Sequence, residues 1–92
     1  MEMRTIDKHL QKLLGDDWWY NHRSEFFTWR MYCIQATDDR LVLKFNGDVM
    51  EAVDLFRFAD IDRVHEALKK LFAEAFPRYT GDPNPDILSD RS

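Results

Sequence analysis

The sequence of 92 residues is poor in the residue types from which covalent and catalytic sites are built, with one cysteine, three histidines, three glycines and three prolines. A single cysteine, Cys33, excludes an internal disulfide and is typical of a protein kept in a reducing compartment. No apolar run approaches the ~18 residues of a membrane span, and residues 1–4 lack the apolar region of a signal peptide. We therefore expect a soluble, cytoplasmic protein without a membrane partner.

The scarcity of glycine and histidine also limits the chemistry that the chain can perform. No glycine-rich phosphate loop, nucleophile elbow or Ser-His-Asp order occurs. His9, His22 and His65 have no second histidine or cysteine at a zinc-ligand spacing. Asp60 and Asp62 are explained by the start of a helix, where carboxylates cap the backbone and complement the dipole. We expect no catalytic, cofactor-binding or metal-binding residues, and we predict that the protein is not an enzyme.

Acidic residues outnumber basic ones, 17 to 13, which gives a formal net charge of −4. Proteins that bind nucleic acids neutralise phosphates with Lys and Arg, so the charge argues against direct nucleic-acid binding. Hydrophobic residues make up 45% of the chain and aromatic residues 14%. This composition is typical of one globular domain that can fold alone but has only modest stability.

Alternating apolar residues predict three β-strands between residues 26 and 58. The first strand, over 27–33, has its apolar set at every second position: Phe27, Trp29, Met31 and Cys33. Residues 41–46 repeat the alternation. Asn46-Gly47 is the strongest short signal for a hairpin, so a third strand is expected over 51–58. The first strand should direct its apolar set, Cys33 included, into the core.

The register of the third strand depends on the length of the loop at Asn46-Gly47. A two-residue loop places Met50 opposite Leu43. A four-residue loop places Glu51 opposite Lys44 and creates a cross-strand charge pair. The residue pattern is compatible with both registers.

Two amphipathic helices are predicted on either side of the strands. The first follows Thr5 as N-cap and ends at Gly15, and the second follows Asp60 as N-cap and ends before Pro77. The sheet is the only apolar surface large enough to cover both helical stripes. We therefore predict an α+β fold in the order α-β-β-β-α, with a three-stranded antiparallel meander covered on one face by both helices. This domain spans residues 1–77, and residues 78–92 form an extended acidic tail.

The segment between the first helix and the first strand is rich in aromatic residues. Trp18, Trp19 and Tyr20 have two interpretations: they close one end of a small core, or they form part of a partner surface. Phe56 and Phe58, near the end of the third strand, would form an apolar patch if both were exposed. We therefore regard the third strand as a candidate binding edge.

The order helix, three strands, helix resembles that of double-stranded-RNA-binding domains. Such domains bind phosphate with lysines at the start of the second helix. Here that helix begins with Asp60, Ile61 and Asp62, and Lys69 and Lys70 come two turns too late. The charge at the helix start therefore argues against that family.

The remaining hypothesis is non-catalytic protein binding. By analogy of size, charge and aromatic content, the chain would occlude a basic surface of a larger protein such as a nuclease, as toxin-immunity proteins and phage-encoded anti-defence inhibitors do. The predicted partner-binding residues are Trp18, Trp19, Tyr20, Asp48, Glu51, Asp54, Asp60 and Asp62. One alternative is a homodimeric adaptor or chaperone-like assembly protein that pairs through the open sheet. Another is a small enzyme built on a buried carboxylate or histidine.

Overall fold

The computed structural model describes residues 3–56 and 58–76 of the chain. Its elements, in chain order, are α1 (Thr5–Leu14), β1 (Trp19–Asn21), β2 (Phe26–Trp29), β3 (Tyr32–Ala36), β4 (Arg40–Phe45), β5 (Asp48–Asp54) and α2 (Ile61–Ala75). The α+β class is confirmed, but the predicted three-stranded sheet is an undercount, because the sheet has five strands. Pro77 and the tail predicted over 78–92 lie outside the described residues.

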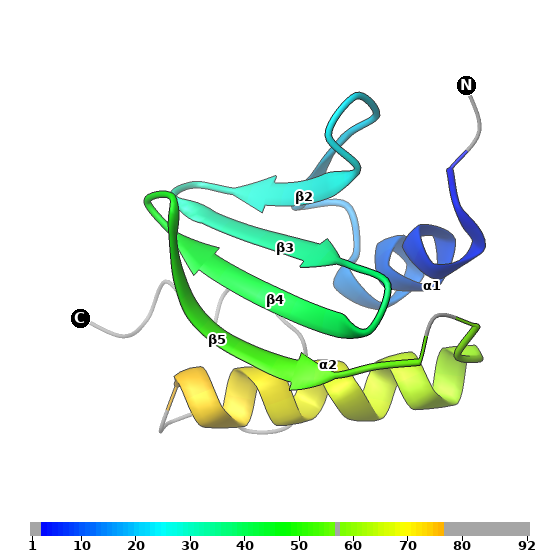
Figure 1. Cartoon of the computed structure of the whole chain (residues 1–92). Coiled ribbons are helices and arrows are strands. Elements are labelled where there is room, and N and C mark those ends of the chain that lie inside the picture. Colours follow the sequence, from blue (N-terminus) through cyan, green and yellow to red (C-terminus); the bar gives the residue numbers. More distant parts are fainter. Residues whose placement is uncertain (1–2, 57, 77–92) are drawn as a thin grey trace.

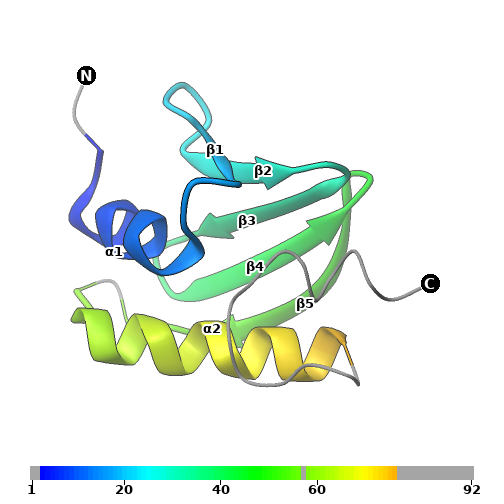
Figure 2. The same cartoon turned by 180° about the vertical axis from the view of Figure 1, so that it is seen from behind.

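The five strands form one antiparallel meander in the order β1-β2-β3-β4-β5 (Figure 1). Seen from behind, both helices lie on the same face of the sheet (Figure 2). α2 packs against β4 and β5, and α1 packs beside α2. The described residues place no helix on the opposite face of the sheet, and β1 and β5 are the two edges of the sheet.

One hydrophobic core lies between the sheet and the helices. It collects the inward residues of every strand and the apolar stripe of each helix. Its most deeply buried members are Leu10, Phe27, Ile34, Leu41, Leu43, Val64, Leu68, Leu71 and Phe72. The core residues of α2 follow the i, i+4, i+7 spacing seen in the sequence, so they form one apolar stripe along the helix. This stripe packs against β4 and β5.

Both predicted helices are present, although the start of α1 differs. α2 begins after Asp60, whose Oδ1 accepts the backbone N–H of Arg63 at 2.9 Å, so this N-cap is confirmed. Gly15 ends α1 with a φ of +84°. Thr5 is the first helical residue rather than the cap, and Arg4 occupies the N-cap position without a capping bond from its side chain.

The first predicted strand is wrong, because it is a hairpin of two strands. Trp29 pairs with Tyr32, and the two residues between them, Arg30 and Met31, form the turn. Arg30 has a φ of +56°, and its guanidinium lies over the Trp29 ring at 4.9 Å from the centroid. Since paired residues share a face, the core positions change from odd numbers in β2 to even numbers in β3. Cys33 therefore lies half-buried on the helix-free face, not in the core.

β1 lies in the aromatic segment after α1, where no strand was predicted. Tyr20 pairs with Phe27 and is buried, whereas Trp19 before it points outward. The tight connection to β2 depends on Asn21. Its Oδ1 accepts hydrogen bonds from the backbone N–H groups of Arg23 and Ser24 at 2.9 and 3.0 Å. A side chain that mimics a turn in this way makes a hairpin possible without glycine.

β4 and β5 are joined by the two-residue loop Asn46-Gly47, in which both residues have positive φ, +53° and +89°. This is the pattern of a type I′ turn, so the hairpin signal is confirmed. A β-bulge farther along the pairing then places Glu51 opposite Leu43. The register of the two-residue loop is present next to the turn, where Lys44 pairs with Val49, but the bulge makes Met50 an extra residue, so Met50 does not lie opposite Leu43. The register of the four-residue loop, with Glu51 opposite Lys44, is wrong.

β5 ends at Asp54, before the predicted end of the third strand. The N–H of Leu55 still donates to the carbonyl of Asp39 at 3.0 Å. At Phe56 the chain turns, and its carbonyl accepts the N–H of Ala59 at 3.1 Å. The turn leads directly to α2 and leaves Phe56 at the boundary between the sheet edge and the helix.

Candidate functional site

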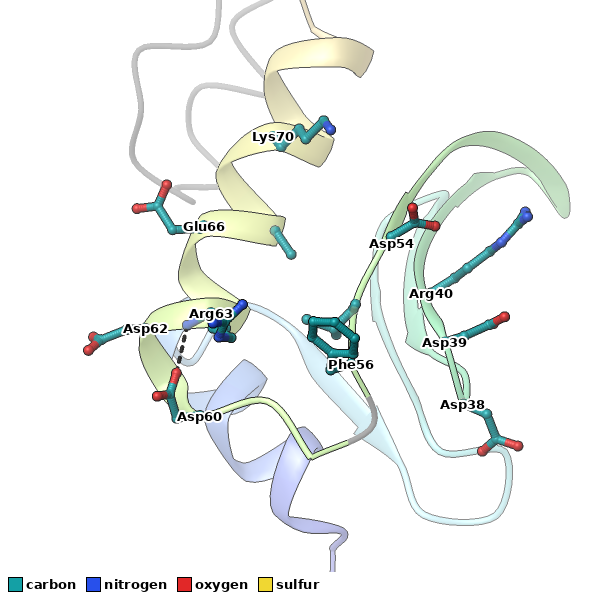
Figure 3. Close-up of a pocket in the computed structure, with 12 residues that line it drawn as sticks. Asp38, Asp39, Arg40, Asp54, Phe56, Asp60, Asp62, Arg63, Glu66 and Lys70 are labelled. Carbon is teal, nitrogen blue, oxygen red and sulfur yellow. Dashed lines mark hydrogen bonds between the residues drawn. The ribbon is translucent and has the colours of Figure 1, made fainter.

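A groove lies where β5 ends and α2 begins (Figure 3). Three segments form it: residues 38–40 before and at the start of β4, residues 54–56 at the end of β5, and residues 60–70 at the start of α2. The groove has a volume of about 1120 Å³. Figure 3 shows the α2 side chains on one side, those of residues 38–40 on the other, and Phe56 between them. The meander creates this site, because it brings the β3–β4 turn beside the end of β5.

The groove is strongly acidic. Its carboxylates are Asp38, Asp39, Asp54, Asp60, Asp62 and Glu66. Its cationic side chains are Arg40, Arg63 and Lys70. Six negative groups against three positive ones leave an excess of negative charge in a concave surface, where walls of low dielectric concentrate the field.

Most of these carboxylates are free to act on a ligand. Glu66 is paired with Lys69 at 3.4 Å on the exposed side of α2. Asp60 accepts one backbone bond as the N-cap. Among the described residues, Asp38, Asp39 and Asp54 make no ion pair within 4.0 Å. Their charge is therefore not cancelled by close partners within this part of the chain.

An aromatic side chain lies in the middle of this acidic surface. Phe56 is 72% exposed. The guanidinium of Arg63 lies 5.8 Å from its ring centroid, within the range of a cation–π contact. Leu55 and Ala67, which also line the groove, are buried. The combination of an apolar floor, one exposed aromatic ring and a charged rim is typical of protein-binding surfaces.

The structure brings only part of the predicted partner-binding set together. Asp54, Asp60 and Asp62 line the groove. Asp48 lies at the opposite end of β5, and Glu51 lies between the two ends. The other residues that line the groove are not in the predicted set, and among them are the three carboxylates Asp38, Asp39 and Glu66 and the aromatic Phe56. The signal for Asp38 and Asp39 was present, since a meander places a β3–β4 turn beside the end of the next strand.

The three aromatic residues of the predicted set are separated by the pleat of β1. Trp18 and Tyr20 are buried, at 5% and 7% exposure, and only Trp19 is exposed, at 64%. Trp18 packs against Trp29, with ring centroids 6.0 Å apart. Trp18 and Tyr20 thus belong to the core, and a partner surface can use Trp19 alone. Trp19 is on β1, at the sheet edge opposite to the groove.

A second polar cluster lies inside the protein, away from the groove. Asp7 is fully buried and accepts the hydroxyl of Tyr20 at 2.7 Å and Nε of Arg4 at 2.8 Å. Burial, and then the hydrogen bond to Asp7, hold the pKa of Tyr20 well above its ordinary value. The hydrogen bond to Asp7 also raises the pKa of Arg4. The cluster ties α1 to β1, which is a structural role.

The helix-free face of the sheet is a second accessible surface. Strand pairing aligns one row across all five strands: Trp19, Thr28, Cys33, Lys44 and Val49. The two ends of the row, Trp19 and Val49, are exposed at 64% and 61%. Burial raises the pKa of the Cys33 thiol, and the facing Lys44 ammonium lowers it in part. This face carries apolar side chains that no described element covers.

The described residues contain no group of three or more His, Cys, Asp or Glu side chains arranged to hold a metal ion. The acidic groove therefore offers separated charges rather than a set of converging ligands. None of the helices described is both long enough and apolar enough to cross a membrane.

The fold and the groove together define an α+β domain with a five-stranded meander and an acidic groove at one sheet edge. Comparison with known proteins gives no match among protein-family models, curated proteins or solved structures.

Proposed function

We propose that this chain is a small, acidic, non-catalytic protein-binding module that occludes a basic surface of a larger protein. The observation that carries the proposal is the groove, whose lining includes six carboxylates and an exposed Phe56. The class of partner follows from the charge: a basic surface such as the substrate channel of a nuclease. Toxin-immunity proteins and phage-encoded anti-defence inhibitors act in this way, and we propose that this chain belongs to that functional class.

The groove supplies two separate contributions to such binding. Exposed carboxylates steer a basic partner toward the groove and act mainly on the association rate, which falls as salt screens them. Phe56 supplies apolar contact area once the complex has formed, and therefore acts mainly on the dissociation rate. The two contributions can be measured independently.

The experiment begins with a partner captured from a lysate that contains candidate nucleases, then purified. Association is measured against ionic strength for the wild type and for a groove variant, Asp38→Asn, Asp39→Asn and Asp54→Asn combined. The matched control combines Asp16→Asn, Asp17→Asn and Glu74→Gln, which removes the same charge at exposed positions outside the groove. Asp60 is left unchanged because it caps α2.

We expect the groove variant to associate about tenfold more slowly at low salt and to show a weaker salt dependence, with a much smaller effect in the control. Phe56→Ala should instead raise the dissociation rate. Equal slowing in both charge variants would mean that net charge, not the groove, attracts the partner. An unchanged rate in both would remove the acidic groove from the mechanism.

A second candidate function is homodimeric assembly through the helix-free face. The observation in its favour is the row between Trp19 and Val49, whose two exposed ends lie on an otherwise half-buried surface. Size-exclusion chromatography with light scattering tests this directly. A dimer lost in Val49→Asp but kept in the groove variant would favour assembly, whereas a monomer at all concentrations would exclude it.

A further inference from the structure

We infer that the free edge of β5 binds an extended, basic segment of the partner as an added β-strand. This inference rests on the proposed function and specifies how the partner is held. It names the recognised element, a short extended stretch rich in Lys or Arg, and it places the main-chain contacts on β5 beside the groove.

The first step is the direction of the β5 backbone. β5 pairs with β4 on one side only, and its other side is an edge of the sheet. The N–H of Leu55 points toward β4, since it donates to the carbonyl of Asp39 at 3.0 Å. Alternate residues of a strand turn their polar groups to opposite sides. The N–H and C=O groups of Ala52 and Asp54 therefore point outward.

These outward groups are available to a ligand. Within the described residues, neither Ala52 nor Asp54 has a backbone hydrogen bond outside the strand pairing. They form a short template for one more strand, which is the mode of recognition called β-addition. The template ends at the groove, because Asp54 itself lines it.

The second step is the charge around this edge. A strand added along β5 would lie on the side of β5 away from β4 and extend past Asp54 toward Phe56, with its side chains pointing alternately to the α2 face and to the helix-free face of the sheet. Carboxylates occur on both faces near this edge: Asp54, next to the core residue Val53, lies on the helix-free face, and Asp62 and Glu66 lie on α2. Lys or Arg at every second position of the added strand shares one face and would meet the carboxylates on that face, and a Lys or Arg at a neighbouring position would meet those on the other.

The same charges argue against a second copy of this chain as the occupant. A two-fold axis at the β5 edge would bring two identical acidic grooves together, and like charges facing each other across strands are destabilising. The bulge and the carboxylates thus protect the edge from self-pairing, as edge strands commonly require. A basic strand is the occupant that this edge does not repel.

The test uses a blocked eight-residue peptide of alternating lysine and valine as the probe, titrated at low salt by calorimetry. A second peptide has the same sequence with all of its backbone amides N-methylated, which keeps the charge and removes strand pairing along both edges. On the protein, Ala52→Pro removes an outward N–H at a position where an edge strand tolerates proline. Ala52→Val is its control, because it keeps that N–H.

We expect the N-methylated peptide and the Ala52→Pro variant each to weaken binding by about tenfold or more, because each removes main-chain hydrogen bonds and introduces a steric clash between the two strands. Ala52→Val should change the affinity little. Hydrogen exchange gives the second readout. At saturation with the lysine-valine peptide, the N–H groups of Ala52 and Asp54 should become protected. Those of Val53 and Leu55 face β4 and serve as the internal reference for an intact fold.

Three results would overturn the inference. They are equal binding of the N-methylated peptide, unprotected Ala52 and Asp54 amides at saturation, and no binding of the lysine-valine peptide at low salt. Protection of these amides that grows with protein concentration alone would assign the edge to a second copy instead. If the groove variant still slows association with the purified partner, any of these results leaves the proposed function standing. If it does not, both fail.

Discussion

The hydroxyl of Tyr20 donates to a carboxylate oxygen of Asp7 across 2.7 Å in the protein interior. This bond joins β1 to α1, two elements that residues 15–18 separate in the sequence. Arg4 binds the same carboxylate and also donates to the carbonyl of Ala36 at 3.0 Å. One buried acid therefore anchors the N-terminal helix to two strands of the sheet.

Removing this acid should destabilise the fold more than removing its tyrosine partner. Asp7→Ala leaves both the Tyr20 hydroxyl and the Arg4 guanidinium without their acceptor, at a cost of about 3 kcal/mol. Tyr20→Phe removes a single bond and leaves Asp7 paired with Arg4, at a cost of about 1 kcal/mol. Urea unfolding measures both, and a larger loss in Tyr20→Phe than in Asp7→Ala would contradict this assignment.

The raised pKa of Tyr20 predicts a loss of stability at high pH. Below about pH 10, the ordinary pKa of tyrosine, both folded and unfolded states hold the phenolic proton and the contribution is complete. Above it the unfolded state releases the proton while the folded state keeps it, so stability falls by up to roughly 1.4 kcal/mol per pH unit until the folded pKa is reached. Unfolding curves at pH 8 to 11 should therefore decline less steeply for Tyr20→Phe than for the wild type. Parallel declines would mean that Tyr20 is not held protonated.

Truncation of the two adjacent tryptophans should reduce the free energy of unfolding by very different amounts. Trp18→Ala removes a core side chain that is 5% exposed and should cost about 3–5 kcal/mol. Its indole N–H has no hydrogen-bond partner within the described residues, so the loss comes from packing. Trp19→Ala, at an exposed position, should cost less than about 1 kcal/mol. Thermal unfolding of the two variants side by side is the measurement, and similar losses would mean that β1 is paired in the other register.

Cys33 should react slowly with thiol reagents in the folded state. Burial raises its pKa, so the reactive thiolate is scarcer at neutral pH than in an unfolded chain, and Lys44 opposes this effect only in part. The rate of reaction with a disulfide reagent at pH 7 should therefore rise on unfolding in urea. Lys44→Met should slow the native reaction further. Native labelling as fast as that of the unfolded chain would contradict the half-buried position on the helix-free face.

The helices could be predicted because their signals are local. The apolar spacing of α2 and the Asp60 cap lie within a few residues of each other, and nothing distant alters them. The hairpin of β2 and β3 could not, since its turn is made by Arg30 and Met31 rather than by glycine or asparagine. The apolar alternation continues through this turn without a break, so the residues give no sign that the chain has reversed.

The candidate site was predictable only to the extent that its residues are close in sequence. Asp54, Asp60 and Asp62 line one groove because they flank one turn. Asp38 and Asp39 belong to the groove through the pairing of Arg40 with Asp54, which depends on the bulge in β5. The meander alone predicts that the β3–β4 turn lies near the end of the next strand, but a bulge has no dependable mark in the sequence, so which β5 residue pairs with Arg40 required the structure.

The meander also has a consequence for how the chain folds. Every strand pairs with its sequence neighbour, across connections of two to four residues. Loops this short close quickly and at little entropic cost, and a topology dominated by such contacts folds fast. During synthesis the sheet can therefore form hairpin by hairpin before α2 has emerged. Until α2 docks, the core side chains of β4 and β5 remain uncovered, so α2, the last element in the described part of the chain, ends the period of greatest risk of aggregation.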